Sequence, residues 1–253
     1  MSKKQQGKQE AIARKPLVWL HGEIKTPPFS FDGRQEAGML LRLLQEGNVL
    51  GMPQAEALPD VGARCGALRV RDAEHNWRIM YRIDTDAVLI LDVYCKKTRK
   101  IPGEVIERCE KRLKQYGPRR SKLGSEDRLM DAAKRKLIEA AGWKSGDAAD
   151  FLEMSDQERQ LLDTRVKLAL AIRQQREALH LSQKQLGALL NTSQPRVAKI
   201  ERAASDVSMD QLIRAFTAAG GKIVVKTTKP KTKKKQPTSG PIETLILEMA
   251  TSE

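Results

Sequence analysis

Two groups of side chains in this sequence have the types and the spacing needed to bind a polyanion. The first lies in the stretch Leu181–Glu201, LSQKQLGALLNTSQPRVAKIE, whose pattern predicts two short helices joined by a tight turn. Gln194, Arg196 and Lys199 are expected to face outward there, and such side chains suit base edges and phosphates. The second group is basic: residues 1–120 carry 23 Lys and Arg against 15 Asp and Glu. That excess indicates a second polyanion site away from the helical pair.

A few small or capping residues shape the predicted helical pair. Ser182 is a good N-cap for the first helix, and Gly187 is small enough for a second helix to cross closely. Asn191 stands where the chain must reverse, and asparagine tolerates the left-handed conformation. Ser193 is expected to cap the second helix, with Pro195 in its first turn. The apolar side chains expected to face inward are Leu186, Leu189, Leu190, Val197 and Ile200.

This stretch resembles the helix-turn-helix of the Cro/repressor-like (XRE) family. The DNA-binding set that the resemblance implies is Gln183, Ser193, Gln194, Arg196 and Lys199. Gln194 and Arg196 then read bases in the major groove, while the first and last members of the set hold phosphates. The family also implies a structural ion pair between Arg176 and Glu201. The alternative is a helical hairpin that binds no DNA.

The first half of the chain predicts a small α+β domain. Leu17–Leu20, LVWL, is a short apolar run typical of a buried strand. Ser30 is expected to cap a helix that runs to about Glu46, and residues 48–65 are expected to form a loop. Three more strands and a helix that ends at Gly117-Pro118 should follow: Ala67–Arg71, Trp77–Asp84, Ala87–Tyr94 and Pro102–Tyr116. The expected order is therefore β-α-β-β-β-α.

Basic side chains gather on one face of this predicted sheet. In WRIMYRID the apolar residues alternate with Arg78, Met80 and Arg82, so the two arginines share a face. Arg69 is expected on the same face, and the basic run KKTRK (96–100) follows the last strand. No His, Asp and Glu cluster has the spacing of metal ligands, so we expect neither a metal nor another cofactor.

The strand order and four phrases of the sequence resemble the phage-derived branch of the RelE/HigB-like toxins of type II toxin–antitoxin systems. The phrases are KPLVWLHGEIKTPPFS, LRV, WRIMYRID and VYCKKTRKIP, and the resemblance covers about residues 15–116. It implies a metal-independent endoribonuclease that cuts mRNA, in many members on the ribosome, and so inhibits translation. In that chemistry the ribose 2′-hydroxyl attacks the adjacent phosphorus, and fixed cationic side chains stabilise the growing charge.

The resemblance also assigns roles to the basic residues. Arg78 becomes the phosphate clamp, because the family keeps a catalytic Arg after the aromatic residue of the middle strand. Arg69 and Arg82 join it, while Lys96 and Lys97 serve as a proton donor or a second clamp. Two of these assignments have a purely structural alternative: Arg69 is then only a residue of the strand, and the KKTRK run is only a solvated turn. The weaker candidates are Tyr94 and His75.

The second half predicts helices and resembles an antitoxin. Helices are expected at Leu129–Ala141, Asp147–Leu152, Ser155–Ala178 and Ser208–Ala219, with a strand at Lys222–Lys226. Together with the helical pair they resemble the HigA-like antitoxin that usually accompanies such a toxin. The last apolar piece, PIETLILEMA, is expected to be either a short helix or a docking peptide.

The expected organisation is an α+β RelE-like toxin domain, with a small antiparallel sheet and helices, followed by an all-α helix-turn-helix domain. The boundaries are a disordered N-terminus (1–15), the toxin domain (16–117), a linker (118–128), the antitoxin (129–226) and a basic disordered tail (227–253). The cysteines, which form no CxxC pattern and are expected to be buried or half-buried, are Cys65, Cys95 and Cys109. No apolar run approaches the roughly 20 residues of a membrane span, and no signal peptide is evident. We therefore expect a cytoplasmic protein with no membrane partner.

These observations predict a fused toxin–antitoxin protein. Its nuclease is neutralised by the antitoxin half, within one chain or between chains, and that half binds operator DNA as a homodimer and represses its own operon. The expected partners are operator DNA, mRNA and the ribosome. The alternative is a DNA-binding regulator whose nuclease-like domain is inactive and serves as a dimerisation or partner module. A further alternative is two separate proteins joined in one chain, which leaves the activity assignment intact.

Overall fold

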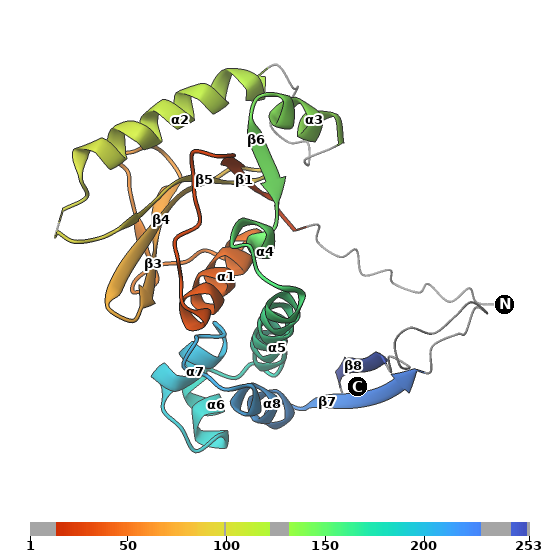
Figure 1. Ribbon diagram of the computed structural model, residues 1–253. Coiled ribbons are helices and arrows are strands. Elements are labelled where there is room, and N and C mark those ends of the chain that lie inside the picture. The colour runs from red at the N-terminus through yellow and green to blue at the C-terminus, as the bar shows by residue number, and fades with distance from the viewer. Residues whose placement is uncertain (1–13, 99, 122–131, 229–243, 252–253) are drawn as a thin grey trace, which may run out of the picture. The chain divides into compact units, whose positions relative to one another are not determined.

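The computed structural model describes residues 14–98, 100–121, 132–228 and 244–251. They divide into two compact units, 1–162 and 163–253 (Figure 1). The division falls within a single helix, α5 (Asp156–Ala178). Most of the expected disordered N-terminus, linker and basic tail lies outside the described residues, so those expectations stay predictions.

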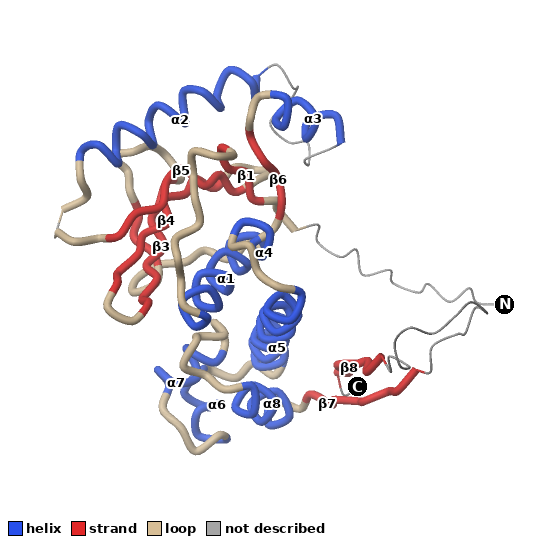
Figure 2. The backbone as a smooth tube through the Cα atoms, in the orientation of Figure 1, coloured by secondary structure: helices blue, strands red, loops and turns tan. Residues whose placement is uncertain are grey.

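The first unit is built on a six-stranded sheet with the order β2-β3-β4-β5-β1-β6 (Figure 2). Its strands are β1 (Leu17–Leu20), β2 (Ala55–Ala57), β3 (Cys65–Asp72), β4 (His75–Ile83), β5 (Val88–Cys95) and β6 (Trp143–Gly146). Neighbouring strands are antiparallel except β1 and β5, which pair in parallel. The expected α+β class is confirmed, and the sheet is mixed rather than purely antiparallel.

Helices cover both faces of this sheet. The helices of the unit, besides the start of α5, are α1 (Phe31–Gln45), α2 (Gly103–Ser121), α3 (Ala132–Ala140) and α4 (Ala148–Phe151). Figure 1 shows α1 and α2 on opposite sides of the strands. The core between them is apolar, with Leu68, Ile79 and Leu89 fully buried. A sheet covered on both sides explains why β4 and β5 carry apolar side chains on both faces.

The start of α1 is fixed to the end of β3. Ser30 caps the helix, as expected, by accepting a hydrogen bond from the Gly33 backbone N–H at 3.1 Å. The Ser30 backbone N–H and hydroxyl both donate to the buried carboxylate of Asp72. A Cβ on Gly33 would lie 2.5 Å from the Asp72 Cγ, so this close approach requires glycine.

Residues after the expected linker complete the first unit. The strand β6 pairs with β1 along four residue pairs, and the Trp143 ring lies edge-on to Tyr116 with centroids 5.3 Å apart. The Asp147 carboxylate caps α4 and also receives Arg42 Nη2 at 3.2 Å. A short strand such as β6 takes its conformation from its partner strand, and the sequence reading did not anticipate it.

The predicted end of the helix at Gly117-Pro118 is wrong. The backbone of α2 continues to Ser121. Tyr116, just before this pair, is 2% exposed and packs on Trp143. Tertiary packing of this kind outweighs the local tendency of proline to interrupt a helix.

The second unit continues α5 into a helical region and a two-stranded ribbon. Its elements are α6 (Gln183–Leu189), α7 (Gln194–Ile200), α8 (Met209–Ala218), β7 (Gly221–Thr228) and β8 (Thr244–Thr251). The strands β7 and β8 pair in antiparallel fashion over eight residue pairs. The apolar piece PIETLILEMA is therefore mainly a strand, neither of the two forms expected for it, and its residues 241–243 lie outside the described ranges.

The local signals of the helical pair are largely confirmed. Ser182 forms a capping box with Gln185, and Asn191 has the left-handed φ of 50°. A Cβ on Gly187 would lie 2.8 Å from the Thr192 carbonyl oxygen, so the turn does require a small residue there. Two details differ. Ser193 makes no side-chain capping bond, and Leu189, expected to face inward, is 58% exposed because α6 ends at this residue.

None of the helices in the described ranges combines the length and the apolar character needed to cross a membrane.

The three cysteines match the expected burial: Cys65 and Cys109 are buried and Cys95 is half-buried.

Candidate nucleic-acid interfaces

The first candidate site is centred on Arg78 in the middle strand of the sheet. Arg78 lies opposite Arg69 on β3 and Tyr94 on β5. Its side chain is only 9% exposed, its Nη1 donates to the Trp77 carbonyl at 2.9 Å, and its Nε has no hydrogen-bond partner among the described residues. Burial lowers the pKa of Arg78, and the neighbouring Arg69 lowers it further. The fold therefore holds the Arg78 guanidinium away from solvent and beside a second guanidinium, an arrangement that favours an anionic ligand.

Three further side chains surround this arginine pair. Glu56 on β2 receives Arg69 Nη2 at 2.9 Å, and this hydrogen bond is the main reason why the pKa of Glu56 is lowered. The charges of Lys96 and Arg78 lower that pKa as well. Burial raises the pKa of Tyr94, and its hydroxyl has no hydrogen-bond partner among the described residues. The structure thus brings together Glu56, Arg69, Arg78, Tyr94 and Lys96, which we call the Arg78 cluster.

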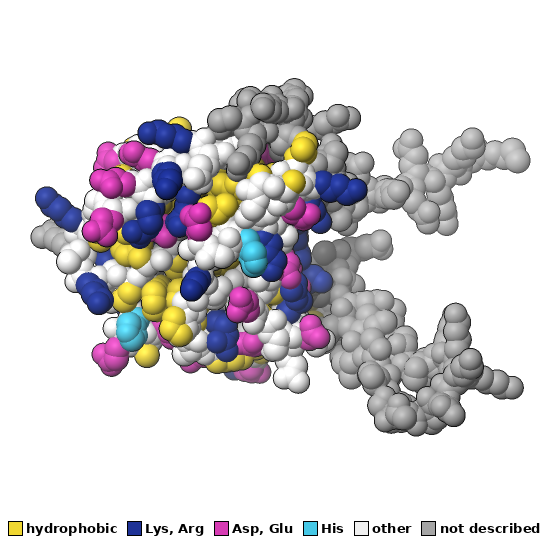
Figure 3. Space-filling model, turned by 45° about the horizontal axis from the view of Figure 1, so that its top comes forward, with side chains coloured by type: hydrophobic (Ala, Val, Ile, Leu, Met, Phe, Trp, Pro, Cys, Tyr) yellow, Lys and Arg dark blue, Asp and Glu magenta, His cyan; other side chains and the backbone are white. Residues whose placement is uncertain are grey.

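The register of β5 is fixed by two arginines of α2. Arg112 Nη1 donates to the Leu91 carbonyl at 2.6 Å and to Asp92 Oδ1 at 3.0 Å. Arg108 Nη2 donates to Asp92 Oδ2 at 2.7 Å. These bonds hold β5 against α2, and so they position Tyr94 two residues further along the strand. Figure 3 shows acidic and basic side chains interspersed on the visible, described part of α2.

The structure does not bring Arg82 into the Arg78 cluster. Its guanidinium binds the buried carboxylate of Asp84 through two bonds, of 2.8 and 3.0 Å. Arg64 approaches the same carboxylate at 3.5 Å. Arg82 pairs with Cys65 at the other end of the strand, where its charge compensates a buried acid.

Two other predicted residues, Lys97 and His75, lie outside the Arg78 cluster. Lys97 is exposed, one residue beyond the half-buried Lys96. His75 is the first residue of β4 and stacks on Trp77, with ring centroids 5.9 Å apart. Successive strand residues point to opposite faces, so His75 and Trp77 belong to the face opposite Arg78.

Sequence reasoning missed Glu56. The residue falls in the segment 48–65 that was expected to be a loop, and β2 is only three residues long. A three-residue strand leaves too few positions for an alternating pattern, so no periodicity in the sequence predicts it. Only pairing with β3 shows that Glu56 lies beside the arginines.

The second candidate site is on α7. Gln194 is exposed, and its Nε2 donates to Gln183 Oε1 at 2.7 Å. Gln183 Nε2 in turn donates to Glu201 Oε2 at 2.9 Å. The expected ion pair between Arg176 and Glu201 is present, with Arg176 Nη2 3.2 Å from Glu201 Oε2, and it raises the pKa of Arg176. A chain of side chains from α5 thus orients Gln194 at the start of α7.

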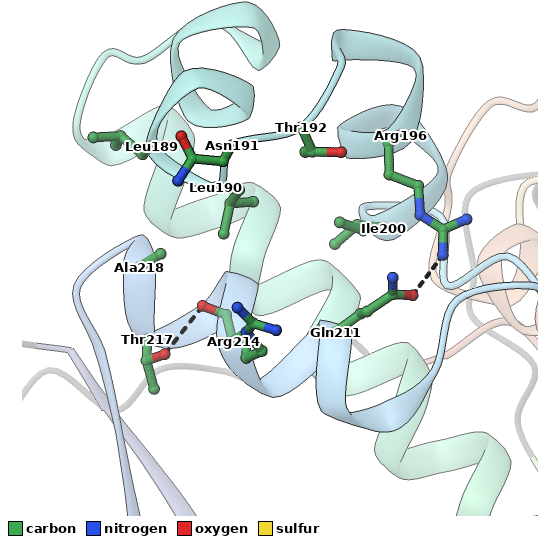
Figure 4. Close-up of a pocket in the computed structure, with 10 residues that line it drawn as sticks. All are labelled: Leu189, Leu190, Asn191, Thr192, Arg196, Ile200, Gln211, Arg214, Thr217 and Ala218. Atoms are coloured by element: carbon green, nitrogen blue, oxygen red, sulfur yellow. Dashed lines mark hydrogen bonds between the residues drawn. The ribbon is translucent and has the colours of Figure 1, made fainter.

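Arg196 and Lys199, further along α7, are both bound by Asp206. Arg196 Nη1 lies 3.0 Å from Asp206 Oδ2, and Lys199 Nζ lies 2.7 Å from the same oxygen. Arg196 also donates to the Asp206 carbonyl and to the side chain of Gln211 on α8. Figure 4 shows the Arg196 guanidinium turned toward Gln211, at one end of a groove of about 600 Å³. The exposed members of the predicted DNA-binding set are therefore Ser193, Gln194 and Lys199, while Gln183 and Arg196 are half-buried.

Two family models match this chain. Residues 29–114 match the family model described as phage derived protein Gp49-like (DUF891), and residues 148–228 match the model of a helix-turn-helix domain. The chain joins a Gp49-like domain to a helix-turn-helix domain. Gp49-like domains belong to the RelE-like toxin superfamily, whose members are endoribonucleases, and the two matches together support a toxin–antitoxin-like DNA-binding protein. No match was found among curated proteins or solved structures.

The Gp49-like unit is larger in the structure than its family match. The match ends at residue 114 and the helix-turn-helix match begins at residue 148, whereas the compact unit extends to residue 162. Residues 148–162 therefore belong to the helix-turn-helix match by sequence and to the Gp49-like unit by packing. The strand just before them, β6, joins the sheet on the β1 side, whereas the Arg78 cluster lies on β2 to β5 and on the residue that follows β5.

Proposed function

We propose that the Gp49-like unit is a metal-independent endoribonuclease of the HigB kind, which cuts mRNA on the ribosome and so inhibits translation. The observation that carries the proposal is the buried Arg78, next to Arg69 and Tyr94: the Arg78 Nε and the Tyr94 hydroxyl have no hydrogen-bond partner among the described residues. These side chains offer hydrogen-bond donors to the oxygens of one phosphate. The family match supports the same reaction class.

The cluster contains the groups that such a cleavage needs. The ribose O2′ attacks the adjacent phosphorus while the P–O5′ bond breaks, which leaves a 2′,3′-cyclic phosphate and a 5′-hydroxyl. Glu56 accepts the proton of the 2′-hydroxyl, because its lowered pKa keeps it ionised. Tyr94 or Lys96 returns a proton to O5′. Arg78 and Arg69 hold the non-bridging oxygens, whose negative charge grows in the transition state.

We propose that the second half is a HigA-like antitoxin of the XRE type that binds operator DNA as a homodimer and represses its own operon. The exposed Gln194, oriented through Gln183 and Glu201, supports base reading at the start of α7. Lys199 and Ser193 are exposed on the same helix and supply phosphate contacts. Neutralisation of the nuclease by this half, within one chain or between the two chains of a dimer, is part of the proposal.

The nuclease proposal is tested with residues 1–162, the compact unit without the helix-turn-helix, and ribosome-bound mRNA. Arg78→Ala should reduce cleavage by at least about 100-fold, because it removes a preorganised charge from the transition state. The matched control is Arg135→Ala, since Arg135 is an exposed arginine of α3 in the same unit. A fragment 1–162 that cuts no RNA, or an Arg78→Ala variant as active as the control, would contradict the nuclease. The Gp49-like unit would then be an inactive partner module of a DNA-binding regulator.

The DNA-binding proposal has its own test. Gln194→Ala should abolish the preference for the operator over random DNA and leave weaker, salt-sensitive binding. Electrophoretic mobility shift with the DNA upstream of the gene measures both. An unchanged preference would remove α7 as the base-reading helix.

A further inference from the structure

We infer that Asp206 is an electrostatic latch on α7 that competes with DNA phosphates for Arg196 and Lys199. The inference rests on the DNA-binding function proposed above. A single carboxylate oxygen, Asp206 Oδ2, receives Arg196 Nη1 at 3.0 Å and Lys199 Nζ at 2.7 Å. Two cations of the helix thus share one anionic oxygen, as they would share a phosphate oxygen.

The two cations are held to different degrees. Arg196 has further acceptors in the Asp206 carbonyl and the Gln211 side chain, so it stays in place when the carboxylate is neutral. Lys199 is exposed, and among the described residues the Asp206 carboxylate is the one hydrogen-bond partner of its ammonium group. Asp206 therefore keeps mainly Lys199 from binding a DNA phosphate, whereas Arg196 stays bound to its other acceptors whether or not Asp206 is charged.

The carboxylate is present as an anion under ordinary conditions. The hydrogen bond from Lys199 lowers the pKa of Asp206, and the charges of Lys199 and Arg196 act in the same direction. A phosphate that approaches Lys199 meets this negative charge at contact distance and has to displace it. The latch thus lowers the affinity of α7 for any duplex, and it reduces the number of phosphates that the helix neutralises.

Gln194, at the start of α7, makes no contact with Asp206. Gln194 contacts Gln183, and that pair continues to Glu201 and Arg176 rather than to Asp206. Opening the latch therefore leaves the base-reading end unchanged. Replacing Asp206 should change the phosphate contribution to binding while the orientation of Gln194 is kept.

The test uses the intact chain, a random-sequence 24-base-pair duplex and fluorescence anisotropy at several salt concentrations. Asp206→Asn keeps the size of the side chain and removes its charge. It should raise affinity about three- to tenfold at low salt and steepen the salt dependence by about one unit of slope. Asp210→Asn is the matched control: Asp210 is an exposed acid in the first turn of α8 and has no contact with either cation. It should change affinity much less.

A Lys199→Gln background separates a latch from a general charge effect. The gain from Asp206→Asn should disappear there, because no ammonium group remains to be released. Equal gains from Asp206→Asn and Asp210→Asn, or a gain that persists without Lys199, would overturn the latch and leave DNA binding intact. Failure of both the wild type and Asp206→Asn to bind the duplex at low salt would overturn DNA binding by α7, and the latch with it.

Discussion

Replacement of Phe151 by alanine tests whether residues 148–162 belong to the core of the Gp49-like unit. Phe151 ends α4 and is 2% exposed. Its ring lies edge-on to Trp19 of β1, with centroids 5.3 Å apart and an interplanar angle of 74°. Truncation leaves a cavity between α4 and the sheet. The free energy of unfolding of this unit should therefore fall, although the residue lies outside the Gp49-like family match.

The size of the effect follows from the buried ring. A fully buried Phe→Ala change costs about 3–5 kcal/mol. With an m-value of about 2 kcal/mol per molar urea, the unfolding midpoint should fall by about 1.5–2.5 M. A control at an exposed site, Leu137→Ala on α3, should move it by less than about 0.3 M, since Leu137 is 54% exposed.

Tryptophan fluorescence makes the assay specific for this unit. The three tryptophans of the chain are Trp19, Trp77 and Trp143, and all lie in the first unit. Urea unfolding of the intact chain, followed at their emission, thus reports on the Gp49-like unit alone. Equal midpoints for Phe151→Ala and Leu137→Ala would refute the packing of α4 on this sheet. Residues 148–162 would then belong with the helix-turn-helix alone.

Three further changes have defined outcomes. Gly187→Ala should destabilise the helix-turn-helix by about 1–3 kcal/mol, measured by circular dichroism, because its Cβ would meet the Thr192 carbonyl oxygen at 2.8 Å; an unchanged transition would contradict this. The hydrogen bond from Arg69 lowers the pKa of Glu56, so the carboxylate stays ionised until the pH falls below the usual glutamate range, and the cleavage rate should be constant down to that pH. Glu56→Gln should slow cleavage about 100-fold and remove the fall in rate at low pH. Burial raises the pKa of Cys109 to about 12, so limited alkylation at pH 8 should modify the half-buried Cys95 first, as mass spectrometry can check.

Local chemistry explains which parts of the fold were predictable. Ser30 and Ser182 each precede an apolar periodic segment, and each accepts the capping hydrogen bond expected of it. The alternation in WRIMYRID placed Arg78 on the same face as Arg69, and the two residues do pair across β3 and β4. These features depend on neighbours within a few residues or on a period of two, and both are visible in a sequence.

The features of the fold that could not be predicted depend mainly on contacts between residues far apart in the chain. The strand β6 exists because it pairs with β1, more than a hundred residues earlier, and β8 exists because it pairs with β7. Arg82 carries the same charge as Arg78, but only the fold shows that its near neighbour Asp84 is buried and therefore needs this charge. In the same way, Arg196 could be read as outward-facing until the loop that carries Asp206 is placed beside it.

The ends of the cleaved RNA test the central claim most directly. Residues 1–162, incubated with ribosome-bound mRNA, should produce fragments with a 2′,3′-cyclic phosphate and a 5′-hydroxyl. The Arg78→Ala variant should produce none above background, and Arg135→Ala should match the wild type. Fragments that begin with a 5′-phosphate would contradict attack by the 2′-hydroxyl at the Arg78 cluster.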